Sequence, residues 1–208
     1  MTHRALVLCN GEPPSRRLVH SVASRVDLVV AADGGANIAR RLGIRPHVII
    51  GDFDSIKSAT RRFFASSLII HVGRQDNTDL EKALDYVQEA GMTNVMVLGL
   101  TGKRIDFTLA NLSVLWKYSS SLEIGVMGDG WRGILVRAKT VIRARRGTTV
   151  SLLPFGICRG ISVRGLKYPL TDASMRVGEI GVSNVVTRPP VTVSVRRGKM
   201  MVFVMDTR

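Results

Sequence analysis

Apolar and polar positions along the first 130 residues repeat one order: an apolar run, a short loop rich in glycine and aspartate, and then a helical pattern. Three units of this kind begin at the runs DLVVAAD (27–33), VIIGDFD (48–54) and NVMVLGL (94–100). Strands that alternate with helices predict a mainly parallel sheet flanked by helices on both faces. Ligands of such sheets bind beyond the carboxyl ends of the strands, where the polar loops of all three units lie.

A further helix is predicted over residues 78–90, with Gly91 as its C-terminal stop. Its apolar positions share one face, which consists of Leu80, Ala83, Leu84, Val87 and Ala90. This spacing is typical of a helix that packs against a core.

After about residue 130 the apolar period changes to two, and the runs are short and broken by glycine or proline. The segment 191–206 is interpreted as a hairpin that turns near Arg197 and Gly198. We therefore predict an α/β domain over residues 1–130 and a smaller all-β domain, of sandwich or barrel type, over residues 131–208.

The composition is that of a globular chain, with 45% hydrophobic and 22% charged residues among 208. No apolar run approaches the roughly 18 residues of a membrane span, so we expect no membrane association. Cys9 and Cys158 lie far apart without a CxxC motif, which gives no support to a disulfide framework or a zinc site. A reducing cytoplasm is the expected location, with both cysteines as packing residues.

The net charge of +14 is uneven. Residues 1–132 carry 16 Lys and Arg against 13 Asp and Glu, whereas residues 133–208 carry 14 against 3. Such asymmetry occurs on nucleic-acid-binding surfaces, but these basic residues mostly alternate with apolar ones, which is also the pattern of a solvated sheet face. The solvated face is the favoured interpretation.

Two aspartates, Asp52 and Asp54, directly follow the apolar run at 48–50. Residues i and i+2 of an extended chain point to the same side, so both carboxylates can face one point. Magnesium is commonly held by one or two carboxylates together with phosphate oxygens. By itself the pair is equally compatible with two solvated loop residues.

Two more polar loops are expected at the same edge of the sheet. Thr78 and Glu81 have the spacing of a capping box, while Asp79 either complements the helix dipole or is a third metal ligand. The loop TGKRID (101–106) adds Lys103, Arg104 and Asp106, and arginine is suited to bidentate phosphate binding. Phosphoryl chemistry is the resulting hypothesis, although the P-loop, GxGxxG and GxSxG motifs are absent.

Together with the motifs around them, these polar loops closely resemble those of the thiamine pyrophosphokinases. Six motifs occur in the order and with the spacing of that family, and they cover most of the chain: ADGGAN (32–37), GDFDSI (51–56), QDNTDLEKAL (75–84), GKRIDFTLANL (102–112), GLKYPL (165–170) and VSN (182–184). The resemblance implies transfer of a diphosphate group from ATP to the hydroxyl of thiamine, giving thiamine diphosphate and AMP.

The resemblance also implies roles for single residues. Asp52, Asp54 and Asp79 would hold Mg²⁺ on the ATP phosphates, Arg104 would pair with phosphate, and Asp106 would help to position the nucleotide or the metal. The further residues implied to face ATP are Asp33, Gly34, Gln75, Asp76, Thr78, Lys82 and Asn111.

The thiamine site is implied to involve the second domain. The matching residues are Tyr168, Ser183 and Asn184. A homodimer with its active site near the subunit interface is expected on the same ground.

Two other functions remain open. A related pyrophosphokinase that acts on another hydroxymethyl heterocycle, such as a pterin, would use the same metal and ATP residues. A basic nucleic-acid-binding module is the alternative from a different class, but aromatic residues make up 5% of the chain, which disfavours stacking on single-stranded bases.

Overall fold

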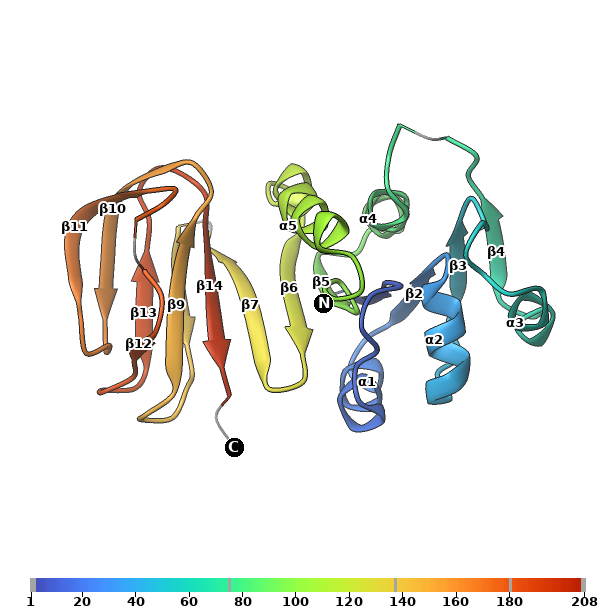
Figure 1. Ribbon diagram of the computed structural model, residues 1–208, viewed down its shortest axis with the longest axis horizontal. Helices are drawn as coiled ribbons and strands as arrows, with labels where there is room; N and C mark the ends of the chain where they lie inside the picture. Colours follow the sequence, from blue (N-terminus) through green and yellow to red (C-terminus); the bar gives the residue numbers. More distant parts are fainter. Residues whose placement is uncertain (1–2, 75, 137, 180, 207–208) are drawn as a thin grey trace. The chain divides into compact units, whose positions relative to one another are not determined.

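The computed structural model describes residues 3–74, 76–136, 138–179 and 181–206. It divides into two compact units, Met1–Asp129 (unit 1) and Gly130–Arg208 (unit 2), and each is described by itself. Strands and helices alternate through unit 1, as the polarity pattern predicts (Figure 1). Its elements are β1 (Arg4–Leu8), α1 (Arg16–Ala23), β2 (Leu28–Ala32), α2 (Gly35–Leu42), β3 (Val48–Gly51), α3 (Ser58–Phe63), β4 (Leu68–His71), α4 (Asp79–Glu89), β5 (Asn94–Leu98), α5 (Ile105–Tyr118) and β6 (Glu123–Gly128).

The strands of unit 1 pair in parallel in the order β6-β5-β1-β2-β3-β4. The chain proceeds from β1 to β4, returns across the sheet to β5, and continues outward to β6. Right-handed crossovers then require helices on opposite faces, and Figure 1 shows α1, α2 and α3 on one side and α4 and α5 on the other. The direction of winding changes between β1 and β5, which is the position where such sheets bind ligands.

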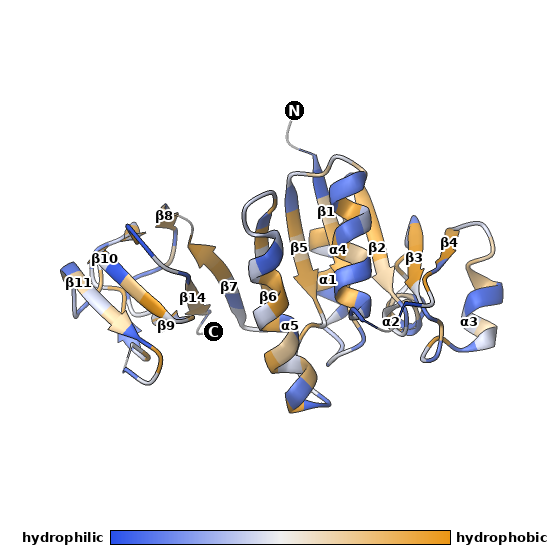
Figure 2. Cartoon of the chain, turned by 90° about the horizontal axis from the view of Figure 1, so that it is seen from above, coloured by the Kyte–Doolittle hydropathy of each residue, from blue (hydrophilic) through white to orange (hydrophobic). Residues whose placement is uncertain are grey.

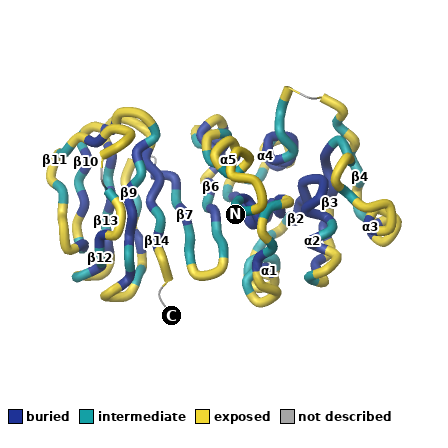
Figure 3. The backbone as a smooth tube through the Cα atoms, viewed as in Figure 1, coloured by how far each residue is buried: buried dark blue, intermediate teal, exposed yellow. Residues whose placement is uncertain are grey.

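The central strands of unit 1 are apolar along their length because helices cover both faces (Figure 2). Figure 3 shows the same strands as buried. Packing between α2 and β1 is close: a Cβ on Gly35 would lie 2.0 Å from the Leu8 carbonyl oxygen. Gly35 therefore allows this approach between helix and strand.

Helix α4 confirms the sequence pattern in most respects. Leu80, Ala83, Leu84 and Val87 are buried, and Gly91 follows the helix at φ 73°. Ala90 is exposed, because the helix ends at Glu89 and Ala90 is its C-cap.

Unit 2 consists of two antiparallel sheets, ordered β12-β9-β14-β7 and β11-β10-β13-β8, whose buried residues form one shared core. Its strands are β7 (Trp131–Val136), β8 (Lys139–Ile142), β9 (Thr149–Pro154), β10 (Ile157–Arg164), β11 (Leu170–Arg176), β12 (Asn184–Val185), β13 (Val191–Ser194) and β14 (Met200–Met205). The expected fold class, a mainly parallel α/β domain followed by a smaller all-β domain, is confirmed.

The predicted hairpin at 191–206 is wrong. The chain turns at Gly198, but β13 pairs with β8 and β10 in one sheet, whereas β14 pairs with β7 and β9 in the other. The turn therefore carries the chain between the two sheets. Both strands are rich in buried valine and methionine, and that pattern does not reveal which sheet each one joins.

Every lysine and arginine that the structure describes between residues 138 and 206 is exposed. These basic residues thus lie on the surface of unit 2, which agrees with their alternation with apolar positions.

Candidate active site

Four carboxylates gather at the carboxyl edge of the parallel sheet in unit 1. Asp33 follows β2, Asp52 and Asp54 follow β3, and Asp79 begins α4. Asp33, Asp52 and Asp54 each offer an oxygen, and these ligand atoms all lie within 4.8 Å of one another. The three thus form a group that is able to hold a metal ion.

Asp33 is the buried member of this group, with 1% of its surface exposed and a backbone φ of 41°. Its carboxylate accepts hydrogen bonds from the backbone N–H groups of Ser55 (2.9 Å) and Ile56 (3.3 Å), which ties the end of β2 to the loop after β3. The pKa of Asp33 is raised to about 6, first by burial and then by the nearby charges of Asp79 and Asp54, while the hydrogen bond from Ser55 acts in the opposite direction.

Asp79 forms an ion pair with Lys82, which lies one turn later in α4. The Lys82 ammonium lies 3.0 Å from Asp79 Oδ1 and 3.6 Å from Asp52 Oδ2, and 2% of its side chain is exposed. Burial raises the pKa of Asp79, and Asp52 and Asp54 add to this, whereas Lys82 lowers it. Lys82 is therefore committed to two carboxylates and contributes an internal positive charge to the site.

The first turn of α4 is fixed by the predicted capping box. Thr78 Oγ1 accepts from the Glu81 backbone N–H (3.2 Å), and Glu81 Oε2 accepts from the Thr78 N–H (3.0 Å). Lys117 of α5 pairs with Glu81 from the other side. These contacts hold the segment that carries Asp79 and Lys82.

Gly51, the last residue of β3, provides space for the carboxylates. A Cβ at this position would lie 2.7 Å from Asp33 Cβ and 3.2 Å from Asp79 Oδ1. A side chain at position 51 would push Asp33 and Asp79 apart. Steric crowding therefore explains why this position of GDFDSI is a glycine.

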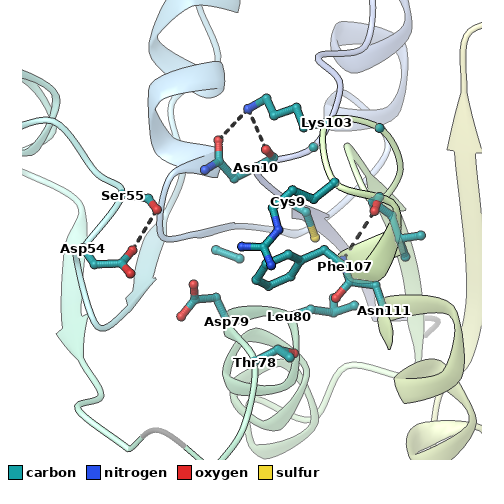
Figure 4. Close-up of a pocket in the computed structure, with 15 residues that line it drawn as sticks. Cys9, Asn10, Asp54, Ser55, Thr78, Asp79, Leu80, Lys103, Phe107 and Asn111 are labelled. Carbon is teal, nitrogen blue, oxygen red and sulfur yellow. Dashed lines mark hydrogen bonds between the residues drawn. The ribbon is translucent and has the colours of Figure 1, made fainter. Parts of the chain in front are cut away.

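A cavity of about 320 Å³ opens beside the carboxylates, at the change of winding between β1 and β5 (Figure 4). Its lining comes from the ends of four strands and from α4 and α5: Cys9, Asn10, Gly11, Ala32, Asp54, Ser55, Thr78, Asp79, Leu80, Leu100, Gly102, Lys103, Arg104, Phe107 and Asn111. Acidic and basic side chains thus face one partly apolar space.

The loop between β5 and α5 supplies the basic side of the cavity. Arg104 is ion-paired with Asp106, and its guanidinium carbon lies 4.4 Å from the centre of the Phe107 ring. The arginine lowers the pKa of the exposed Asp106 carboxyl through a hydrogen bond and its charge. Asp106 is thus paired with Arg104, and among the described residues it does not belong to the group of carboxylates, Asp33, Asp52 and Asp54, whose oxygens lie within 4.8 Å of one another.

Of the remaining residues that the sequence led us to expect at the nucleotide, some line the cavity and others do not. Thr78 and Asn111 line the cavity, and the Asn111 amide donates to the Leu100 carbonyl (3.4 Å). Gly34 lies against the Asn10 side chain, since a Cβ there would be 2.2 Å from Asn10 Nδ2. Asp76 has 75% of its side chain exposed beside Arg74, and Gln75 lies outside the described residues.

In unit 2, the residues expected to bind thiamine are neighbours. The Asn184 side chain accepts from the Tyr168 N–H (3.1 Å) and donates to the Tyr168 carbonyl (2.8 Å), so its amide is used to hold the backbone of that residue. Tyr168 is 62% exposed, and the Lys167 ammonium lies 5.2 Å from its ring centre. Ser183 is exposed at φ 61°.

Sequence reasoning missed two polar residues of the cavity. Asn10 follows β1 at the carboxyl edge, and Ser55 follows Asp54, to whose Oδ1 its hydroxyl donates (2.7 Å). The position of Asn10 after the first apolar run was the available signal, because the same rule identified the other loops.

Comparisons with known proteins agree over both units. Residues 19–126 match the family described as "Thiamin pyrophosphokinase, catalytic domain", and residues 139–200 match "Thiamin pyrophosphokinase, vitamin B1 binding domain". Among curated relatives, thiamine pyrophosphokinase 2 of Arabidopsis thaliana is 28% identical over 92% of this chain and 82% of its own length. Thiamine pyrophosphokinase of Bacillus subtilis is 27% identical over 85% of this chain and 86% of its own.

Solved structures support the same fold. A Bacillus subtilis thiamine pyrophosphokinase superposes with a TM-score of 0.87 at 24% identity, covering 99% of this chain and 100% of its own. A thiamin pyrophosphokinase from Candida albicans gives 0.87 at 19% identity, covering 99% and 90%. At these identities the likeness concerns the fold alone.

Proposed function

Because the chain belongs to the thiamin pyrophosphokinase family, we propose that it transfers a diphosphate group from ATP to the hydroxyl of thiamine, releasing thiamine diphosphate and AMP. The observation that carries this proposal is the cavity at the sheet edge, which has carboxylates on one side and Lys103 and Arg104 on the other. A metal–polyphosphate complex needs both kinds of group.

The carboxylates fit Mg²⁺, which prefers oxygen ligands and retains several waters. Asp52 and Asp54 are the ligands that both the spacing of the carboxylates and the family resemblance support. For a third ligand there are two candidates. Asp33 is supported by the short distance of its oxygen from those of Asp52 and Asp54, and Asp79 is supported by the family resemblance. When bound, Mg²⁺ neutralises charge on the phosphates.

The chain's own residues then have positioning roles. Arg104 lines the cavity and offers a guanidinium to phosphate oxygens, and Asp106 orients that guanidinium through its ion pair. Thr78 and Asn111 add polar groups to the wall. The thiamine hydroxyl attacks the β-phosphorus while the bond to the AMP oxygen breaks, and catalysis comes mainly from orientation and charge.

Incubation of the protein with ATP, MgCl₂ and thiamine tests the reaction. We expect thiamine diphosphate and AMP in equal amounts, measured by chromatography. Release of ADP, or a product formed with a hydroxymethyl pterin in place of thiamine, would contradict the proposal. The family match of residues 139–200 disfavours the pterin alternative. Strong, salt-sensitive binding of DNA or RNA in a shift assay would revive the nucleic-acid alternative.

Tyr168 is the residue of unit 2 that we propose as the thiamine contact. An ammonium already lies over its ring, so the ring face accepts a cation, and thiamine is a cation. Asn184 acts through Tyr168, since it holds the backbone of that residue, and the exposed Ser183 adds a hydroxyl nearby.

Replacing Tyr168 by alanine is expected to raise the KM for thiamine roughly 3- to 30-fold, the range of a cation–π contact. Tyr168→Phe keeps the ring and should stay within about twofold of the wild type. Steady-state kinetics with each substrate varied in turn checks this, and the KM for ATP should not change. An unchanged KM for thiamine in Tyr168→Ala would exclude the contact.

We further propose a homodimer in which α5 contributes to the interface. Ile105 and Leu109, one turn apart on this helix, are 74% and 60% exposed. Exposed apolar side chains at this spacing are typical of a helix face that another surface covers. The same helix carries Phe107 and Asn111 into the cavity, which agrees with an active site near the interface.

The dimer proposal predicts a mass of two chains for the wild type and of one chain for Leu109→Glu, measured by light scattering after gel filtration. Val141→Glu, which alters an exposed apolar residue of unit 2 (55% exposed), is the matched control and should remain a dimer. A monomeric wild type would contradict the proposal.

For location, no helix in the described part of the chain is long and apolar enough to cross a membrane. We propose the cytoplasm on separate grounds, because Cys9 and Cys158 are both free thiols. Fractionation of cells that express the tagged protein would test this.

A further inference from the structure

Lys103 adopts a backbone conformation that lysine rarely takes. Its φ is 59°, in the left-handed region, where residues with a Cβ are strained and glycine is not. Strain of this kind persists where the surrounding structure maintains it, and it is concentrated at functional sites. The local backbone would accept glycine here without strain, so the side chain is the group to examine.

The Lys103 ammonium is held by two neutral oxygens. It donates to the Asn10 carbonyl oxygen (2.7 Å) and to Asn10 Oδ1 (3.1 Å), across the cavity mouth from Asp79 and Thr78 (Figure 4). In the described part of the chain, no carboxylate forms an ion pair with it. Its charge is therefore oriented by the protein but is not neutralised.

The other two cations of the site differ from Lys103 in this respect. Arg104 is ion-paired with Asp106, and Lys82 is buried between Asp79 and Asp52. An anion that enters the cavity thus meets one cation whose present partners are uncharged. Ammonium–phosphate hydrogen bonds are stronger than those to neutral oxygens, so an exchange of partners is favourable.

We propose that Lys103 is a phosphate-binding residue of the nucleotide site, and that its ammonium exchanges the two Asn10 oxygens for phosphate oxygens when ATP binds. This inference rests on the proposed function, because it takes ATP as the ligand. Asn10 thereby keeps an extended lysine in place before binding, which reduces the entropy that the side chain loses on contact.

Calorimetric titration with Mg-ATP in the absence of thiamine tests the role. Lys103→Gly and Lys103→Met are both expected to weaken binding about tenfold, equivalent to about 1.4 kcal/mol. Lys103→Arg should stay within about threefold of the wild type. Lys139→Met, which removes an exposed lysine of unit 2, is the control and should bind as the wild type does.

Two further results separate the possible explanations. Lys103→Gly should not lower the thermal midpoint, because glycine accepts φ 59°; weaker binding in a variant that melts normally therefore supports the phosphate contact. Asn10→Asp should also weaken Mg-ATP binding, since a carboxylate would compete for the ammonium. Wild-type affinity in both Lys103→Gly and Lys103→Met would overturn the proposal.

The titration is independent of the reaction. If the wild type binds Mg-ATP through Lys103 but forms no thiamine diphosphate, the proposed function fails and the role of Lys103 stands. If the wild type forms thiamine diphosphate and the Lys103 variants bind Mg-ATP normally, the opposite holds.

Discussion

Asp54→Asn is expected to lower kcat about 10²- to 10³-fold while leaving the fold intact. Asp54 lines the cavity and contributes an oxygen to the carboxylate group with Asp33 and Asp52. Asparagine has the same shape but lacks the charge that a magnesium ligand and a charge-stabilising group require. The Ser55 hydroxyl can still donate to the asparagine oxygen, so the loop should keep its conformation.

AMP release at saturating ATP, thiamine and MgCl₂ measures the effect, and circular dichroism verifies the fold. Glu89→Gln neutralises an exposed carboxylate at the far end of α4 and should retain wild-type kcat. Electron paramagnetic resonance of Mn²⁺ gives a second measurement, in which Asp54→Asn should bind the ion more weakly. Near-normal turnover in Asp54→Asn would remove this residue from the metal site.

Lys82→Met is expected to lower the free energy of unfolding by about 2–3 kcal/mol when magnesium is removed with a chelator. Methionine fills the volume of the lysine stem but leaves Asp79 and Asp52 without their buried cation. Breaking a fully buried pair costs about 3–5 kcal/mol, and the partial exposure of the two carboxylates reduces this cost. Added MgCl₂ should recover part of the loss, because a divalent cation at the same carboxylates replaces the missing charge.

Urea unfolding with chelator and with MgCl₂ provides the comparison. Lys117→Met is the matched control: its ammonium also pairs with a carboxylate of α4, Glu81, but 66% of its side chain is exposed. We expect Lys117→Met to lower the free energy of unfolding much less than Lys82→Met does, and the loss to be insensitive to MgCl₂. An equal loss for Lys82→Met with and without MgCl₂ would show that Lys82 does not act as a counter-charge for the metal site.

The alternation of strands and helices in unit 1 could be predicted because buried parallel strands are apolar along their length and their loops are polar. Shorter or less apolar elements were not visible. In β4, Leu68 is 54% exposed, and in β11 the segment TDASMR has little apolar alternation. Edge strands of this kind are defined by their partners, and pairing is a long-range property.

The site could be predicted in part for the same reason. Aspartates that follow an apolar run are recognisable in the sequence, and so is the capping box at Thr78 and Glu81. The proximity of Asp33 to Asp54 was not, because it depends on the alignment of β2 with β3, where Ala32 is opposite Ile50. Nor does residue type reveal that Lys82 is buried against carboxylates while Lys103 is held by Asn10.

The position of β14 has a consequence for synthesis of the chain. This strand follows all the others of unit 2 in sequence, yet it is an internal strand that pairs with both β9 and β7. The strand that joins β7 to β9 is therefore missing until the ribosome has passed residue 205. Every strand of unit 1 precedes residue 129, so the parallel sheet and its carboxylates can be assembled while unit 2 is still an incomplete nascent chain.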